Sequence, residues 1–260
     1  PNTNFIKQIG RGSFGTVFSI KHNDILYSIK LPNDKTIPLD EISIYKKLIN
    51  TTCKNFINFK IVPINLNDGD IVFGVLMPKA SGNLNDILDI FKNNEDLCMK
   101  VIKIIGNILL CFLKNDYIYF DIKPNNILFV CKDNKIYLFL GDLGSFVDIK
   151  THEKSIVPTT YLFIIATLDW PNVNLLDNQL VTRILTYLLI LLYLNLYDYE
   201  KYKKFFQSNT IYIFNFFNNF NSKIKESDYT FDQFFYKLYE NLRGSNLTSS
   251  NAADLFLNSF

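Results

Sequence analysis

Three polar side chains near the middle of this chain restrict its fold and chemistry more than any other feature. Asp121, Lys123 and Asn126 place a carboxylate, an ammonium and a carboxamide within six residues, on a loop that a proline stiffens. A second carboxylate, Asp142, follows 21 positions after the first, beside Gly141. Phosphoryl transfer needs such a set: a base at the attacking hydroxyl, a cation at the transferred phosphate, and oxygen ligands for Mg²⁺. One acid alone would indicate a turn or a helix cap, so the hypothesis depends on the whole spacing.

A glycine-rich segment near the start of the chain is a candidate phosphate-binding loop. Its residues are Gly10, Arg11, Gly12, Ser13, Phe14 and Gly15, with Val17 two positions later. The pattern G-x-G-x-x-G alone is weak evidence, since dinucleotide-binding folds share it. Here it joins a predicted strand to another strand and not to a helix, which argues against a dinucleotide site. Glycine hairpins let backbone N–H groups approach phosphates, so a phosphate loop and an ordinary hairpin both fit this segment.

Lys30 ends the apolar run at residues 25–30, where strand alternation directs its side chain inward beneath the glycine-rich segment. An inward ammonium on a strand is costly unless a carboxylate pairs with it. Glu41, on a helix predicted at residues 40–48, is the candidate partner. The alternative is a lysine at a strand end that extends its ammonium to solvent.

The pattern of apolar residues divides the chain into a small β-rich part and a larger helical part, which predicts an α+β fold. In the first part, strands are predicted at residues 5–9, 16–20 and 25–30, and on both sides of a turn within 61–78. In the second part, helical periodicity covers residues 84–91, 98–113 and most of 175–260. Between these helices, residues 117–143 alternate short apolar runs with polar turns.

Composition excludes several classes of function. The chain of 260 residues has a formal net charge of only +2, so neither nucleic acid nor an anionic membrane is an expected partner. The apolar residues 180–197 are about as long as a membrane span but include Arg183 and Asn195, and a buried central helix explains them better than a span. No signal segment opens the sequence, which predicts a cytoplasmic protein. Reduced thiols are expected accordingly at four positions, Cys53, Cys98, Cys111 and Cys131.

Residues 5–144 resemble the eukaryotic protein kinase family, because its major motifs occur here in order and at the family's spacing. The matching positions are Gly10, Gly12, Gly15 and Val17 in the phosphate-covering loop, Lys30 in the V-A-I-K strand, Glu41 in helix C, Asp121 and Asn126 in H-R-D-x-x-x-x-N, and Asp142 in D-F-G.

This resemblance implies one domain over residues 1–260 with a bilobal fold. An N-lobe at residues 1–78 would hold a small antiparallel sheet and one helix, and residues 79–260 would form the hinge and a larger, mainly helical C-lobe. The implied activity is transfer of the γ-phosphate of ATP, with Mg²⁺ or else Mn²⁺, to serine and threonine hydroxyls of proteins. Lys123 carries the Ser/Thr preference, since Ser/Thr kinases have a lysine two residues after the base.

The resemblance also assigns roles to individual residues. The implied catalytic residues are Asp121, Lys123, Lys30 and Glu41. The implied nucleotide-binding residues are Gly10, Arg11, Gly12, Ser13, Phe14, Gly15, Val17, Ser28, Lys30, Met77, Ala80 and Leu128. The implied metal ligands are Asn126 and Asp142.

Departures from the family pattern leave two other hypotheses open. Tyr119 and Phe120 replace the His-Arg before the base, and the missing Arg would normally bind a phosphorylated activation loop. Leu143 replaces the Phe of D-F-G. No A-P-E motif follows residues 159–163, and Asp177 is a weak candidate for the acid that begins the central C-lobe helix. The alternatives are a kinase-like nucleotide-binding scaffold without turnover and a small-molecule kinase of related fold.

The amino-acid composition of the chain gives an indication of its source. Its 24 Phe and 15 Tyr, with many other residues of A/T-rich codons, indicate an A/T-rich genome. A compact kinase of this composition resembles those of large DNA viruses such as poxviruses, and a protist source fits as well. A viral kinase would act in the host cytoplasm or in the virion.

Overall fold

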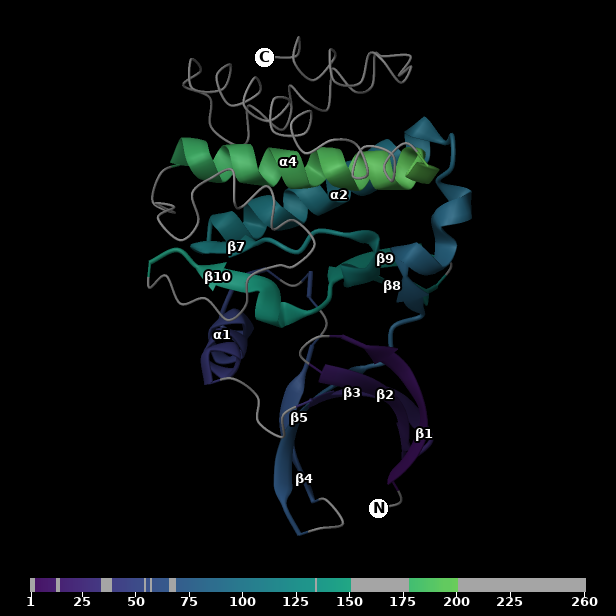
Figure 1. The fold of residues 1–260 in the computed structure, drawn as a ribbon, viewed down its shortest axis with the longest axis vertical. Helices are drawn as coiled ribbons and strands as arrows, with labels where there is room; N and C mark the ends of the chain where they lie inside the picture. The colour runs from purple at the N-terminus through teal and green to yellow at the C-terminus, as the bar shows by residue number, and fades with distance from the viewer. Residues whose placement is uncertain are drawn as a thin grey trace.

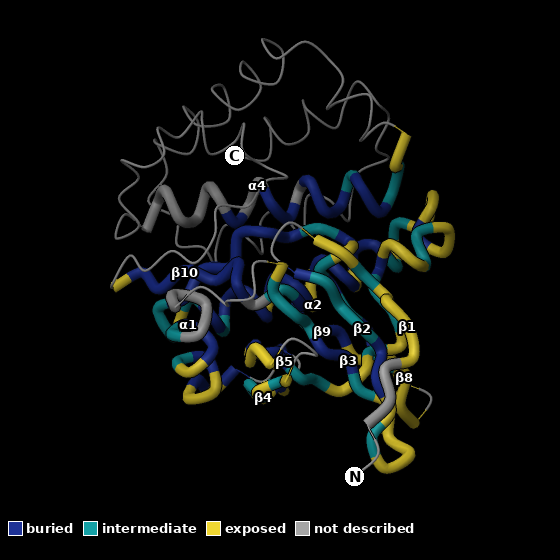
Figure 2. The backbone as a smooth tube through the Cα atoms, turned by 60° about the horizontal axis from the view of Figure 1, so that its bottom comes forward, coloured by how far each residue is buried: buried dark blue, intermediate teal, exposed yellow. Residues whose placement is uncertain are grey.

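The computed structural model describes residues 3–12, 15–33, 39–53, 55–56, 58–65, 69–133, 135–150 and 178–200. In Figure 1 a strongly curved sheet forms one end of this part of the chain, and two long helices lie toward the other end. Small strand pairs and one short helix lie between them. The burial pattern in Figure 2 places most buried residues in the helical part and leaves much of the outer sheet exposed.

The N-terminal sheet has five strands, each antiparallel to its neighbours, in the order β1-β2-β3-β5-β4. A two-residue turn joins β2 to β3, and its residues Asn23 and Asp24 have φ angles of 48° and 65°, a conformation that these residue types tolerate. The strands span β1 Thr3–Arg11, β2 Gly15–His22, β3 Ile25–Pro32, β4 Lys60–Asn65 and β5 Ile71–Pro78.

Helix α1, Leu39–Ile49, accompanies this sheet and faces the helical part of the protein. Ile44, Tyr45 and Leu48 lie on its buried face, at the i, i+1 and i+4 positions that an amphipathic helix turns inward. The predicted N-lobe, a small antiparallel sheet with one helix, is therefore confirmed.

The second part is built on α2, Glu95–Leu113, and α4, Asn178–Tyr197, which pack against each other. Asn94 caps α2 by accepting a hydrogen bond from the N–H of Leu97. Two small sheets lie between these helices and the N-lobe. The remaining elements are β6 Gly82–Asn83, η1 Leu84–Ile90, β7 Tyr117–Tyr119, η2 Pro124–Asn126, β8 Ile127–Lys132, β9 Lys135–Leu140, η3 Leu143–Ser145 and β10 Phe146–Asp148.

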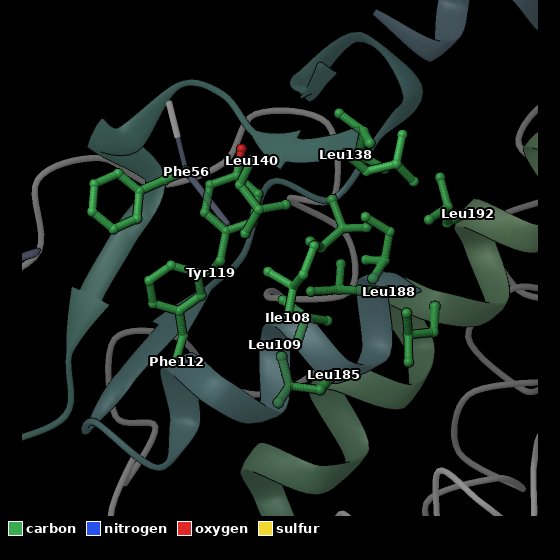
Figure 3. Close-up of a cluster of buried hydrophobic side chains, with 14 of the residues drawn as sticks. Phe56, Ile108, Leu109, Phe112, Tyr119, Leu138, Leu140, Leu185, Leu188 and Leu192 are labelled. Carbon is green, nitrogen blue, oxygen red and sulfur yellow. The ribbon is translucent and has the colours of Figure 1, made fainter. Parts of the chain in front are cut away.

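Among the described residues, buried side chains of α1, α2, α4 and the small sheets form one hydrophobic core. Figure 3 shows its part between α2, α4, β7 and β9. A row of aromatic contacts crosses this core from α1 to β7. Its ring centroids are 4.6 to 6.2 Å apart, the spacing of tilted aromatic pairs. In order, the row contains Tyr45, Phe59, Phe56, Phe112, Phe146 and Tyr119.

The segment at residues 84–91, predicted to be an α-helix, contains the 3₁₀-helix η1, Leu84–Ile90. Ile87 interrupts this helix, because its φ of −130° is not helical. The apolar residues 180–197 fall in α4, and Leu188, Leu189 and Leu192 of this helix are buried in the core. Among the helices that the structure describes, none has the length and apolar character that crossing a membrane requires. The described residues do not include most of the predicted C-lobe helices, nor residues 159–163 and Asp177, which were compared with the family's motifs.

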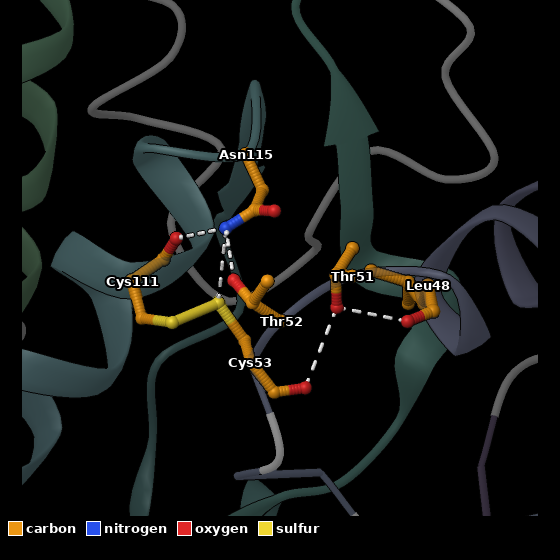
Figure 4. Close-up of a disulfide and its surroundings, with 6 residues drawn as sticks. All are labelled: Leu48, Thr51, Thr52, Cys53, Cys111 and Asn115. Atoms are coloured by element: carbon orange, nitrogen blue, oxygen red, sulfur yellow. Dashed lines mark hydrogen bonds between the residues drawn. A yellow bond between two sulfur atoms is a disulfide. The ribbon is translucent and has the colours of Figure 1, made fainter.

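The prediction of four reduced thiols is wrong for two of the cysteines. Cys53, just after α1, and Cys111, on α2, form a disulfide with Cα atoms 5.8 Å apart (Figure 4). Asn115 braces the linkage, because its Nδ2 donates to Thr52 Oγ1 and to the Cys111 carbonyl. The pairing was not predictable from spacing, since 58 positions separate the two residues and only the fold brings them together.

The four cysteines should therefore differ in reactivity towards an alkylating reagent. Burial raises the pKa of Cys98 to about 12, and its thiol donates to the Phe91 carbonyl, so it stays protonated and shielded at neutral pH. Cys131 is exposed. We expect one label on the native protein, a second after denaturation without reductant, and four after reduction, counted by intact mass. Four labels on the denatured, unreduced protein would contradict the disulfide.

Candidate active site

Asp121 lies at the centre of the polar cluster, directly after the strand β7 and Phe120. It is only 5% exposed, so its carboxylate needs charged or polar partners. Lys123 Nζ lies 2.6 Å from Asp121 Oδ2, and Asn126 Nδ2 donates to the same oxygen at 2.6 Å. Asn126 can reach back because Pro124 starts the single turn η2, which brings position 126 over position 121. Lys123 and Asn126, which the sequence grouped with Asp121 by spacing, thus both contact one oxygen of its carboxylate.

The other oxygen of Asp121 has a different environment. Oδ1 is buried and has no hydrogen-bond partner among the residues that the structure describes. Burying a carboxylate oxygen without a donor is costly, so a native protein keeps such an atom where a ligand or substrate supplies the missing donor. A hydroxyl group at this position would satisfy Oδ1 and have a base at its proton.

Asp142 follows β9 and is held by the loop around Asp121. The N–H of Gly141 donates to the Asn126 carbonyl at 2.8 Å, and the Tyr119 hydroxyl donates to the Gly141 carbonyl at 2.7 Å. A side chain at position 141 could not be added easily, since its Cβ would lie 3.0 Å from Leu128 Cδ1. Asp142 itself has a φ of 47°, a left-handed conformation that aspartate adopts more readily than most residues, and these bonds hold it in place.

Lys30 joins the N-terminal sheet to this cluster. Its Nζ lies 2.8 Å from Asp142 Oδ1, and the two side chains are 14% and 30% exposed. The predicted inward direction of Lys30 and its need for a carboxylate therefore agree with the structure. Among the described residues its partner is Asp142, and the predicted pairing with Glu41 stays a prediction. Glu41 lies on α1, and its side chain is outside the described residues.

The glycine-rich segment crosses above Lys30 between β1 and β2. A Cβ on Gly15 would lie 2.6 Å from the Leu31 carbonyl and 3.2 Å from Lys30 Cε, so only glycine lets the strand pass this close. At Gly12 a Cβ would meet nothing nearer than 3.9 Å. Among the described residues, packing does not require glycine at position 12. Ser13 and Phe14 lie outside the described residues.

Five other predicted nucleotide-binding residues lie in or after strands of the two parts of the fold. Val17 is paired with Lys30 between β2 and β3, and Ser28 with Met77 between β3 and β5. Leu128, the second residue of β8, lies against Gly141. Ala80 follows β5. The side chains of Val17, Met77, Ala80 and Leu128 are apolar, so they can offer a ligand only van der Waals contacts.

Two contacts in the site were not predicted. Asn33, after β3, donates from Nδ2 to the Gly12 carbonyl and accepts from Thr16 Oγ1, so it bridges the two sides of the glycine-rich segment. The Tyr119 hydroxyl holds Gly141. The sequence marked Tyr119 only as a departure from His, although a tyrosine hydroxyl usually has a hydrogen-bond partner when it is buried.

The donor set suits Mg²⁺ bound together with phosphate oxygens. Among the described residues, no group of three or more His, Cys, Asp or Glu side chains forms a metal cage. Mg²⁺ does not need one, because it takes one or two protein oxygens plus phosphate and water. Asp142 supplies a carboxylate, and Asn126 has its carboxamide oxygen left for a cation because its Nδ2 donates to Asp121.

The site thus combines a glycine-rich loop over a lysine, that lysine paired with a second-loop carboxylate, and a buried acid beside a lysine and an asparagine. The family model of the protein kinase domain matches residues 3–173. The chain therefore belongs to the protein kinase domain family. A search of curated proteins found no match to this sequence.

Proposed function

We propose that this chain transfers the γ-phosphoryl group of ATP to serine and threonine hydroxyls of protein substrates. The observation that supports this most is the asymmetry at Asp121. Lys123 and Asn126 hold one oxygen, whereas the other is buried without a donor. A buried acid that only stabilises the fold usually has a protein or water donor at each oxygen.

In this proposal each charged residue has one task. Asp121 Oδ1 accepts the hydrogen bond of the substrate hydroxyl and orients it for attack. Lys123 stands beside that oxygen pair and supplies positive charge where charge builds up on the transferred phosphoryl group. Lys30 holds nucleotide phosphates under the backbone N–H groups of the glycine-rich segment, near Gly12 and Gly15.

Asp142 and Asn126 would hold Mg²⁺, which supplies neutralisation of phosphate charge when it is bound. Lys30 and Asp142 are paired in the structure, so the pair presents a cation and an anion side by side to a metal–phosphate ligand. Val17, Ser28, Met77, Ala80 and Leu128 would surround the adenine, with Met77 and Ala80 near the connection between the lobes.

Three finer statements remain predictions. Ser/Thr preference depends on Lys123 and on the family resemblance. The viral source depends on composition. The cytoplasmic location has evidence against it in the Cys53–Cys111 disulfide, since cytosolic proteins seldom keep disulfides.

The proposal is tested with γ-labelled ATP and Mg²⁺, using a generic basic protein and the chain itself as acceptors. We expect label on serine and threonine and none on tyrosine, read by phosphoamino-acid analysis. We also expect Mg-ATP at ~100 times its Kd to stabilise the fold by about 2.7 kcal/mol, which raises Tm by roughly 5 °C for a chain of this size.

The two readouts separate the alternatives. A rise in Tm without label transfer would favour a nucleotide-binding scaffold without turnover. Label on a small acceptor but on no protein would favour a small-molecule kinase. The absence of both signals, label transfer and a rise in Tm, would refute the proposed function.

A further inference from the structure

An ion pair outside the catalytic cluster connects α1 to the segment that follows Asp142. Lys47 Nζ lies 3.1 Å from Asp148 Oδ2, and the two side chains are 33% and 10% exposed. Lys47 is in the last turn of α1, and Asp148 is the last residue of β10. These two elements lie side by side in Figure 1, although 101 positions separate the residues in the sequence.

Asp148 is fixed from several sides. Its backbone is paired with Tyr117 in the antiparallel ladder between β10 and β7. Its Oδ1 accepts the N–H of Lys150 at 2.9 Å, which leaves Oδ2 for Lys47. The Lys150 ammonium in turn pairs with Asp116, before β7. Because the Asp148 carboxylate is buried and held in place, removal of the Lys47 ammonium would leave it without this cation, at a larger cost than for a surface ion pair.

The strand that carries Asp148 also connects to both catalytic loops. β10 starts four residues after Asp142 and is separated from it only by η3, Leu143–Ser145, against which α1 packs. The partner strand β7 ends two residues before Asp121. A helix held on β10 therefore limits the movement of η3 and of the Asp142 turn.

The Asp142 turn needs such support. Its φ of 47° lies in the left-handed region, which aspartate tolerates but does not prefer, so a loosely held loop would relax to another conformation. Relaxation would move the carboxylate away from Lys30 and from the place where it would bind metal. A displacement of about 1 Å at a reacting centre can lower a rate about a hundred-fold.

We propose that Lys47 and Asp148 are a positioning pair that keeps α1 docked on β10 and so keeps Asp142 in its active geometry, without a phosphoryl group on the chain. This inference rests on the proposed function and adds to it a regulatory property, constitutive assembly of the site. Neither residue touches the substrates. Both act through η3 and the Asp142 turn.

The first test compares three variants of the 260-residue chain, each purified without phosphorylation. Lys47→Met removes the charge and keeps most of the side-chain length, Lys47→Arg keeps the charge, and Lys46→Met changes an exposed neighbour on the same helix. We expect Lys47→Met to lower kcat about ten-fold with a smaller change in KM for ATP, whereas Lys47→Arg and Lys46→Met stay within about two-fold of wild type. Assays at a temperature well below every Tm exclude loss of folded protein as the cause.

The second test does not depend on catalysis. Hydrogen exchange should be faster at the β10 amides and η3 in Lys47→Met than in Lys46→Met, and Asp148→Asn should give the same pattern. Unchanged kcat and unchanged exchange in Lys47→Met would overturn the positioning pair. Equal losses in Lys46→Met would do so as well. If the wild-type chain transfers no phosphate, the proposed function fails, and the exchange comparison still decides whether the pair docks α1.

Discussion

Replacing Asp121 by Asn is expected to lower phosphotransfer at least about a thousand-fold while the fold is retained. General bases contribute roughly 10²- to 10⁴-fold to such reactions. Asparagine has the shape of aspartate, and its carboxamide oxygen can keep the bonds to Lys123 and Asn126. Its NH₂ group would then take the place of Oδ1, where it cannot accept a proton or a hydrogen bond from a hydroxyl. Because Oδ1 has no donor to lose, the substitution removes the proposed function of the residue more than its structural role.

The measurement is kcat and kcat/KM with γ-labelled ATP, together with Tm in the presence and absence of Mg-ATP. Asp121→Asn should keep most of its nucleotide-dependent rise in Tm, since Asp121 is placed at the acceptor hydroxyl and not at the nucleotide. Asp133→Asn is a matched control, because Asp133 is an exposed turn residue with a φ of 51°, which asparagine adopts readily. More than a tenth of wild-type activity in Asp121→Asn would contradict the assignment of the base.

The parts of the fold that the sequence predicted are those set by local patterns. Alternating apolar residues and a two-residue Asn-Asp turn specify β2 and β3, and a single amphipathic face specifies α1. The grouping of Asp121, Lys123 and Asn126 was also predictable, because one turn started by Pro124 is enough to bring them together. Such contacts depend on a few neighbouring residues, so a single sequence contains the necessary information.

Contacts between elements that are distant in the chain could not be predicted from the sequence alone. The Cys53–Cys111 pair and the Lys47–Asp148 pair each join α1 or its end to an element far along the chain. Their partners are chosen by how α1 packs on the core, and no periodicity or spacing contains that orientation. The contact of Lys30 with Asp142 was missed for the same reason. The sequence predicts a carboxylate partner for Lys30 and names Glu41, but only the tertiary arrangement places Asp142 at 2.8 Å from its ammonium.

Lys30→Met is expected to lower kcat/KM at least about a hundred-fold and to abolish most of the nucleotide-dependent rise in Tm. Removal of one preorganised donor from a site of developing charge costs roughly 10²- to 10³-fold. Lys30 is proposed to contact the phosphates, so its loss weakens nucleotide binding as well as the chemical step. The substitution also leaves the Asp142 carboxylate, 30% exposed and on a disfavoured backbone, without its cation. The geometry of the metal ligand should therefore suffer together with the phosphate contact.

The two site variants are distinguished by the thermal readout, because Asp121→Asn keeps the response to Mg-ATP and Lys30→Met loses it. Lys21→Met is the matched control for Lys30→Met. Lys21 lies on the adjacent strand, is 49% exposed, and pairs with Asp24 at the surface, where an ion pair contributes little. A normal Tm response in Lys30→Met would mean that this lysine does not hold the nucleotide. The comparison is informative even if the chain proves to be a scaffold without turnover, since nucleotide binding alone produces the signal.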